Sequence, residues 1–417
     1  MNFSYWFSKK IRVGRGAATS SSTGAVIAVA GVALAVMVME LTLAVVAGFK
    51  HQIERKLMGF ESAVTIMPPY DYDREEVLPQ MHLTDSLISL IKQSVPGAIP
   101  VGVASRQAIV KTDSDFIAVQ CVAYDDNHNC DFERSNLTVG KQDVFPLRAD
   151  SIVISSTMAR KMKLDTASRP FVYFFVNDRP VVRRATVGAI YNSNFSDYDN
   201  TVMYAPMSMM QSLTDDTAAI MSVAVENLGE CSADKIESIS DELQSRIVEH
   251  YRTGRLSEVY PVTNVLERGA TFYSWLGLLD TNVVVIFILM VCVAAFTLIS
   301  SLFIIILDCV GTIGILRSLG TRGNVVSRIF IYVVFRLVGL GMIIGNVVAL
   351  GIIAVQNKTH FLPLNPEMYY LDSVPFELTW QAVVILNICV LAGAWLILVL
   401  PARMASRISP DTIMRYE

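Results

Sequence analysis

The sequence predicts a membrane α-helical protein with four transmembrane helices and a large α+β extracytoplasmic domain inserted between the first and second spans. Four apolar runs, at residues 24–48, 281–307, 329–355 and 380–400, each reach the ~20 residues that cross a ~30 Å hydrocarbon core. Hydrophobic residues make up 53% of the chain and charged residues 17%, against roughly 25% charged in soluble domains. Because lipid offers the backbone no hydrogen-bond partner, each run must be helical.

Short basic segments predict the orientation of these spans. Lysine and arginine gather in residues 1–23, in the link 308–328 and in the tail 401–417, and such residues mark the cytoplasmic side. Residues 49–280 and the loop 356–379 are therefore expected outside. The tail 1–23 mixes aromatic and basic residues, which favours a short cytoplasmic interfacial helix. The first run exceeds the ~7–15 residues of a signal-peptide core, which favours a retained span over a cleaved leader.

The segment between the first two spans is acidic and has a mixed pattern. Residues 49–280 carry a net charge of −9, whereas the rest of the chain sums to +5. Short β-rich runs alternate with amphipathic stretches, which predicts an α+β domain with two subdomains and helical stalks at its two ends. The β-rich runs begin near residues 64, 116, 151, 170, 185, 201 and 220, and the helical stretches are 84–94, 156–163, 206–213 and 233–249.

Cysteine spacing in this segment leaves the disulfide state open. Cys121, Cys130 and Cys231 are an odd number, so at least one of them has no partner within the segment. Cys121 and Cys130 could pair locally. Unpaired thiols that behave as small hydrophobic side chains are an equal alternative.

The sequence contains no pattern typical of an enzyme. No G-x-x-x-x-G-K-[ST] motif is present, so the chain has no P-loop for ATP phosphates. No serine lies in G-x-S-x-G. The histidines are scattered without zinc-ligand spacing, at His51, His82, His128, His250 and His360. We therefore predict no catalytic residues, no metal site and no cofactor in this chain, and we expect energy to come from a partner.

The link 308–328 carries the most informative cytoplasmic pattern. It reads DCVGTIGILRSLGTRGNVVSR, in which Ile313, Leu316 and Leu319 share one helical stripe. Arg317 lies beside the stripe, and Gly320 can end the helix. The pattern predicts a docking helix. An ordinary interfacial helix that connects two spans is an equally valid interpretation.

Three segments carry a family resemblance. Residues 311–330, GTIGILRSLGTRGNVVSRIF, are similar to the coupling segment of the FtsX-like permease superfamily, which includes lipoprotein-releasing and macrolide-efflux permeases. The ending PARMASRISPDTIMRYE resembles the family ending, and residues 28–66 resemble the first span and stalk of LolC/LolE-type permeases. The size of the insert and the absence of a fused ATPase favour that type. Asp308, Cys309, Val310 and Thr321 depart from the family pattern.

The resemblance implies the permease subunit of an ABC transporter that extracts lipoproteins from the inner membrane and passes them to a periplasmic carrier. The implied partners are a separate ABC ATPase that binds ATP and Mg, a second permease copy or paralogue, the carrier, the acylated lipoprotein and membrane lipid, with no nucleic acid. The implied ATPase contact comprises Ile313, Gly314, Ile315, Leu316, Arg317, Leu319 and Gly320. Two alternatives are an FtsX-like signalling permease that controls cell-wall hydrolases and a MacB-like efflux permease.

An acidic residue inside the first span is a candidate for substrate contact. Glu40 lies about 24 Å along the first helix from Gly24, and intramembrane ionisable residues are usually functional. We predict that it faces a lateral cavity where lipid enters, together with Met37, Met39 and Leu41. A glutamate hydrogen-bonded at a helix interface is the alternative.

The third span contains a motif for close helix packing. Gly341 and Gly345 form G-x-x-x-G, whose missing side chains let two helix backbones approach each other. Packing within the subunit is the expected use, in preference to dimerisation.

Overall fold

In a computed structural model the described residues are 20–69, 80–140, 142–147, 150–176, 179–213, 216, 218–229 and 232–405. The chain divides into two compact units. The first comprises Met1–His51, Trp275–Pro363 and Ser373–Glu417, and the second comprises Gln52–Ser274 and Leu364–Asp372. Most of the interfacial helix predicted for residues 1–23, and the tail beyond residue 405, lie outside the described residues.

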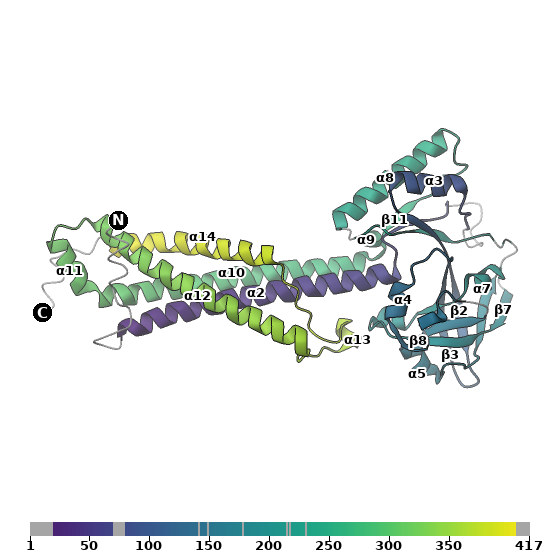
Figure 1. Cartoon of the computed structure of the whole chain (residues 1–417), viewed down its shortest axis with the longest axis horizontal. Helices are drawn as coiled ribbons and strands as arrows, with labels where there is room; N and C mark the ends of the chain where they lie inside the picture. Colours follow the sequence, from purple (N-terminus) through teal and green to yellow (C-terminus); the bar gives the residue numbers. More distant parts are fainter. Residues whose placement is uncertain are drawn as a thin grey trace. The chain divides into compact units, whose positions relative to one another are not determined.

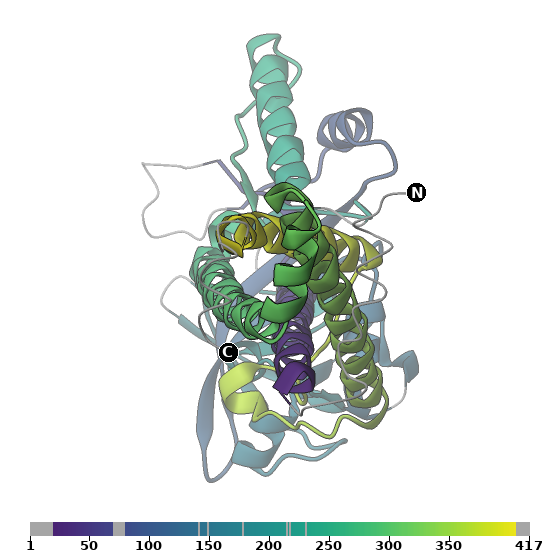
Figure 2. The ribbon, with the colours of Figure 1, turned by 90° about the vertical axis from the view of Figure 1, so that its left-hand side faces the viewer.

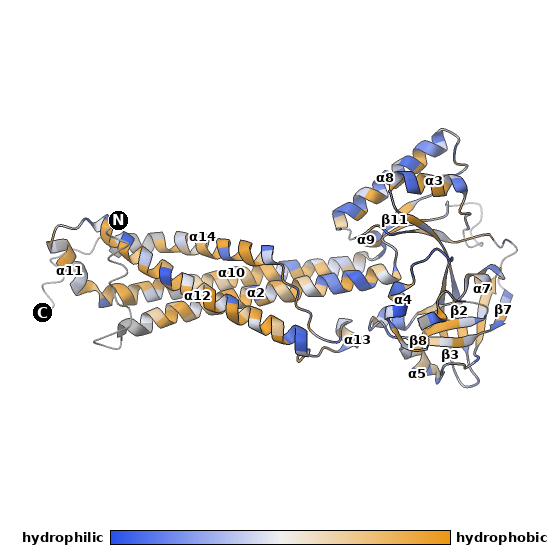
Figure 3. Ribbon diagram, viewed as in Figure 1, coloured by the Kyte–Doolittle hydropathy of each residue, from blue (hydrophilic) through white to orange (hydrophobic). Residues whose placement is uncertain are grey.

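Four long helices dominate the first unit (Figures 1 and 2). They are α2 (Ser20–Phe60), α10 (Ala270–Asp308), α12 (Gly323–Thr359) and α14 (Trp380–Ala405). Each contains one predicted span, and among the described residues four helices are long and apolar enough to cross a membrane. Figure 3 shows the apolar residues distributed along them. The helices continue beyond the predicted spans because backbone hydrogen bonding does not stop at the edge of the hydrocarbon.

Residues from all four helices form the core of this bundle, and α2 and α12 approach most closely at the two glycines. A Cβ atom on Gly345 would lie 2.7 Å from the Ala33 carbonyl oxygen and 3.0 Å from Val36 Cβ. One on Gly341 would lie 2.9 Å from the Val29 carbonyl oxygen. Packing of the G-x-x-x-G motif within the chain is thereby confirmed.

Polar and aromatic contacts join α2 to α10 beyond the apolar core. The Phe49 and Trp275 rings meet edge to face, with centroids 5.5 Å apart. Lys50 Nζ lies 2.8 Å from Asp280 Oδ2. The loop between α12 and α14, which contains α13 (Pro366–Tyr369), also contacts α2, since the Glu377 N–H donates to the Ala44 carbonyl at 3.0 Å.

The second unit contains one mixed sheet of eleven strands in the described part of the chain. The order is β11-β1-β10-β2-β3-β9-β5-β8-β4, and the β6–β7 hairpin pairs with β2. The strands are β1 (Val64–Ile66), β2 (Ile99–Lys111), β3 (Phe116–Tyr124), β4 (Leu137–Val139), β5 (Ser151–Ser155), β6 (Phe171–Val176), β7 (Arg179–Arg184), β8 (Thr186–Tyr191), β9 (Val202–Tyr204), β10 (Ser222–Glu226) and β11 (Val262–Asn264).

Short helices cover this sheet, and several begin at residues suited to capping. Thr84 and Ser155 accept hydrogen bonds from the N–H groups of Leu87 and Met158 at the starts of α3 and α5, as N-cap residues do. The helices are α3 (Asp85–Ser94), α4 (Asp131–Ser135), α5 (Ser156–Met162), α6 (Ser196–Asp199), α7 (Met207–Gln211), α8 (Ala233–Arg252) and α9 (Val265–Arg268), with a 3-10 turn at Gln142–Val144.

Two large hydrophobic cores share the sheet. One includes α5 and α7 and is centred on residues such as Ile154 and Phe174, and the other includes α3 and α8 and is centred on residues such as Leu87 and Leu243. The thirteen-residue strand β2 pairs with β10, β3 and β6; it contributes to the core with α5 and α7, and its neighbour β10 contributes to the core with α3 and α8. The sequence predicted two subdomains and missed β2, and the structure instead has one sheet with two cores.

A buried histidine ties three elements of the second unit together. His128 Nδ1 lies 2.6 Å from Glu226 Oε1 on β10, and Nε2 lies 3.1 Å from Glu133 Oε1 on α4. Its ring stacks on Tyr124 at the end of β3, with centroids 3.8 Å apart. Burial acts to lower the pKa of His128, but hydrogen bonds and charges from Glu133 and Glu226 outweigh it and raise the pKa to about 9.

The stability of the second unit should therefore fall as pH rises above neutrality. Between pH 6.5 and about 9, folded His128 keeps a proton that the unfolded chain has released, so the unfolded state binds fewer protons. The stabilisation is complete below pH 6.5 and is lost as pH passes 9, and it amounts to roughly 3 kcal/mol at most. Urea unfolding of the full chain, followed by near-ultraviolet circular dichroism, should show that the difference between wild type and His128→Gln shrinks over this range. Parallel pH profiles would contradict the assignment.

The glycine contact between α2 and α12 should be sensitive to one added side chain. Gly345→Val should destabilise the helical unit by about 1–3 kcal/mol, because the new Cβ would meet the α2 backbone. Gly351→Val is the matched control, since no atom lies within 4 Å of its Cβ position. Thermal unfolding in detergent measures both variants, and equal shifts in Tm would argue against the contact.

Candidate coupling helix and membrane cavity

A short helix connects α10 to α12 (Figure 1). This helix, α11, covers Val310–Ser318, so it is shorter than the predicted link 308–328, and residues 323–328 instead form the start of α12. Gly320 adopts φ +85°, and the Thr321 N–H donates to the Leu316 carbonyl, which is the bond of a Schellman motif. The prediction that Gly320 ends the helix is confirmed.

Large apolar side chains are exposed on α11 and at the residue that follows it. Ile315 is 65% exposed and Leu319 77% exposed, whereas Leu316 and Gly314 are half-buried. The side chains of Ile313 and Arg317 lie outside the described set, although both residues belong to the helix. Exposed apolar residues on a helix between two spans can bind an apolar groove of another protein.

An apolar cavity of about 380 Å³ opens among the membrane helices. Its walls come from α2, α10 and α14, with Val338 contributed by α12. Met39 and Leu43 line it from α2, Phe287 from α10 and Leu386 from α14. Such a cavity can hold hydrocarbon, because its lining offers almost no polar group.

This cavity has little overlap with the residues predicted for substrate contact. Of the four predicted residues, only Met39 is part of it. Glu40 is fully buried, with 0% of its surface exposed, and Met37 and Leu41 are half-buried outside the cavity. Successive residues turn by about 100° around a helix, so the turn that directs Met39 into the cavity directs Glu40 away from it.

Glu40 lies beside a pair of asparagines in the bundle interior. Asn346 of α12 and Asn387 of α14 exchange two amide hydrogen bonds of 3.0 and 2.9 Å. Asn387 is next to Glu40, but its amide group already donates to Asn346 and to the Val383 carbonyl. Both Glu40 oxygens therefore have no hydrogen-bond partner among the described residues. The position is a helix interface, as in the alternative interpretation of Glu40.

A lysine near the end of α2 joins two loops of the second unit. Lys56 Nζ donates to the Ser193 carbonyl at 2.6 Å and to the Tyr370 carbonyl at 2.7 Å. The Tyr370 ring meets Phe195 edge to face at 4.8 Å. Asn194 donates to Asp372. Residues 364–372, from the loop between the third and fourth spans, are thus fixed to the extracytoplasmic unit.

Sequence reasoning missed this junction and most of the cavity. Lys56 and Tyr370 are 314 positions apart, and no local pattern relates them. The apolar residues of α10 and α14 surround each helix, so their spacing does not reveal which side faces a cavity.

The described residues contain no group of three or more histidine, cysteine, aspartate or glutamate side chains that could hold a metal ion. Cys121 and Cys130 are both free thiols, and burial raises the pKa of Cys130 to about 11. A thiol with so high a pKa is a poor nucleophile at neutral pH. Cys231 lies outside the described residues.

Comparison with known proteins agrees with this arrangement. Residues 284–410 match the FtsX-like permease C-terminal domain. The lipoprotein-releasing system transmembrane protein LolC of Xylella fastidiosa is 24% identical over 407 residues, which cover 93% of this chain and 92% of the relative. LolE of Haemophilus influenzae is 28% identical over 161 residues, which cover 36% and 38% of the two chains. The periplasmic region of MacB from Actinobacillus actinomycetemcomitans, 14% identical, covers 50% of this chain and 92% of that structure, with a TM-score of 0.32.

The described residues combine four apolar helices, the short helix α11 and an α+β unit. Residues 284–410 match the FtsX-like permease C-terminal domain, and the chain is similar to LolC along almost its whole length.

Proposed function

We propose that this chain is the permease subunit of an ABC transporter that extracts lipoproteins from the inner membrane and passes them to a periplasmic carrier. The observation that carries the proposal is the similarity to LolC, a lipoprotein-releasing system protein, over 93% of the chain. The apolar cavity between α2, α10 and α14 supplies a place for an acyl chain. Both termini would lie in the cytoplasm, in agreement with the basic flanks of the spans.

Extraction of a lipoprotein requires work because the bilayer holds acyl chains strongly. Each buried CH₂ group contributes about 0.8 kcal/mol, so a single long chain contributes on the order of 10 kcal/mol. A cavity lined by residues such as Phe287 and Leu386 keeps part of that surface away from water during transfer. Its role is to lower the free energy of the extracted state.

A separate ATPase would supply the work through α11. The exposed Ile315 and Leu319 fit an apolar groove, and Arg317 can pair with an acidic rim. ATP and Mg would be bound by that partner, and this chain would be non-catalytic. Because α11 is connected directly to α10 and α12, a displacement of α11 acts on two helices that line the cavity.

Three chain segments would pass this displacement to the extracytoplasmic unit. The continuous helices α2 and α10 both contribute residues to that unit. The third segment is 364–372, which Lys56 holds through its bonds to Ser193 and Tyr370. Hydrogen bonds from a charged ammonium group are stronger than bonds between neutral groups, so Lys56 would hold this segment firmly.

Two surfaces suit the remaining partners. The face of α10 that carries Val284, Ile288 and Phe296 is exposed and would pack on a second permease, either a copy or a paralogue. On the β6–β7 hairpin, Phe175 and Val182 are exposed while Phe174 points into the core. That outer strip, in an otherwise acidic unit, would meet the carrier.

Filling the cavity tests the proposal. Gly393 lines the cavity and has no atom within 4 Å of its Cβ position, so Gly393→Phe should occupy the space without disturbing the backbone. We expect acylated protein bound to the purified complex to fall roughly tenfold, equivalent to about 1.4 kcal/mol. Gly351→Phe, equally open but outside the cavity, is the control. Unchanged binding in Gly393→Phe would exclude this cavity, and a complex that never carries acylated protein would exclude lipoprotein release.

A substitution on α11 should weaken binding of the ATPase without affecting the folding of the permease. Ile315→Asp places a charge on an exposed side chain, so Tm should change little. Recovery of the ATPase with the purified permease should fall tenfold or more, because truncated or charged interface anchors cost about 2 kcal/mol. Asn324→Asp adds the same charge on the exposed start of α12 and should leave recovery unchanged. Equal recovery for both variants would contradict an α11 contact.

A further inference from the structure

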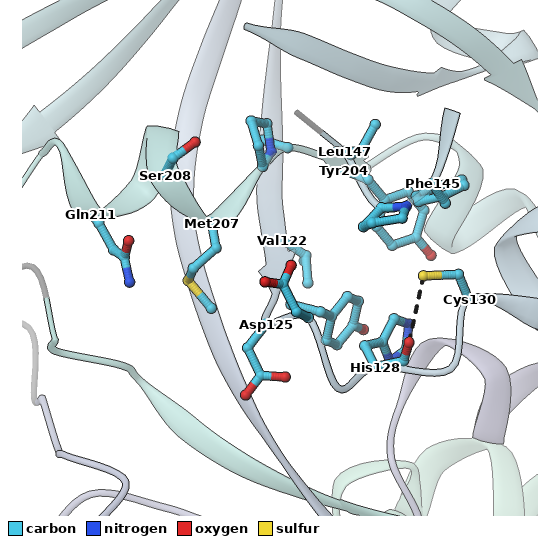
Figure 4. Close-up of a pocket in the computed structure, with 15 residues that line it drawn as sticks. Val122, Asp125, His128, Cys130, Phe145, Leu147, Tyr204, Met207, Ser208 and Gln211 are labelled. Carbon is cyan, nitrogen blue, oxygen red and sulfur yellow. Dashed lines mark hydrogen bonds between the residues drawn. The ribbon is translucent and has the colours of Figure 1, made fainter. Parts of the chain in front are cut away.

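The extracytoplasmic unit contains a second and larger cavity that the release mechanism above does not use. It has a volume of about 630 Å³, within the range of small-ligand sites. Its lining comes from the end of β3 and the loop 125–130, from residues 145–147, and from the segment 204–211, which runs from the end of β9 through α7. Figure 4 shows Phe145 and Tyr204 on one side, Ser208 and Gln211 on the other, and Asp125 between them.

The walls of this pocket combine aromatic surface with negative charge. Tyr124, Phe145 and Tyr204 supply the aromatic part. Asp125 and Asp126 supply two carboxylates, and none of the described residues that line the pocket is a lysine or arginine. Asp125 accepts hydrogen bonds from the Gly102 and Asn127 N–H groups, which fix its position.

The one histidine in the lining does not neutralise this charge. Both ring nitrogens of His128 are occupied, by Glu226 at 2.6 Å and Glu133 at 3.1 Å. The carboxylates of Glu226 and Glu133 together carry two negative charges, whereas the protonated imidazole carries one positive charge. Asp126 is exposed, and among the described residues it forms no hydrogen bond. The pocket thus favours a cation attached to an apolar body.

We propose that this pocket binds a lysine or arginine side chain of an extended peptide segment whose neighbouring apolar side chains contact Phe145, Tyr204 and Met207. The inference rests on the proposed function, under which the polypeptide part of the lipoprotein emerges on the side of this unit. The segment would be held while its acyl chains remain in the membrane. The pocket volume accommodates a few residues, and charge complementarity selects a basic one.

Binding to the full-length chain in phosphatidylcholine nanodiscs tests the assignment. The probes are two fluorescein-labelled, N-acetylated pentapeptides, Ala-Leu-Lys-Leu-Ala and Ala-Leu-Glu-Leu-Ala, measured by fluorescence anisotropy against empty nanodiscs. The lysine peptide should bind more tightly, and added salt should weaken it. Asp126→Asn should weaken it roughly fivefold. Asp113→Asn, an exposed acid at the turn between β2 and β3, should leave binding unchanged.

Three outcomes would overturn the pocket assignment: equal affinity for the two peptides, no binding of either, or equal effects of Asp126→Asn and Asp113→Asn. None of them bears on lipoprotein release itself. Release from the assembled transporter is measured separately, as acylated protein delivered to a soluble acceptor. Loss of peptide binding with intact release would refute the pocket alone.

Discussion

The structure depends on one constraint: within hydrocarbon, every backbone N–H and C=O group must be bonded inside the protein. In the described residues this requirement is met by four unbroken helices. Close approach at Gly341 and Gly345 then sets α12 against α2. The helices α10 and α12 flank α11 directly, so under the proposed function a displacement of α11 would act on both. The proposed transfer of work depends on that direct connection.

The cavity and the polar cluster of the bundle lie on different sides of α2. Met39 contributes to the apolar cavity, and Glu40, one residue later, is fully buried beside Asn387. A fully buried and unpartnered carboxyl group is costly in an apolar interior. Its position within the first span made Glu40 a candidate for substrate contact, and its full burial favours the helix-interface interpretation.

Much of the architecture could be predicted from the sequence because its signals are local. Long apolar runs predict spans, and Gly320 after a helical stripe predicts a helix end, which the positive φ confirms. β2 was missed because Pro100 and Gly102 interrupt its start and Arg106 lies within it, although its residues are mostly buried. Its hydrogen bonds to distant strands outweigh those local preferences. The cavity and the Lys56 junction could not be predicted, because they depend on which helices and loops become neighbours.

The long strand β2 has a consequence for how the extracytoplasmic unit resists tension. Its first residues pair with β10, residues 103–111 pair with β3, and the last four also pair with β6. Residues of β2 belong to the core with α5 and α7, and residues of its neighbour β10 belong to the core with α3 and α8. The two cores therefore cannot separate without breaking hydrogen bonds between β2 and β10. Under a pulling load the unit should yield as a whole, in one cooperative rupture, and not peel apart in two stages.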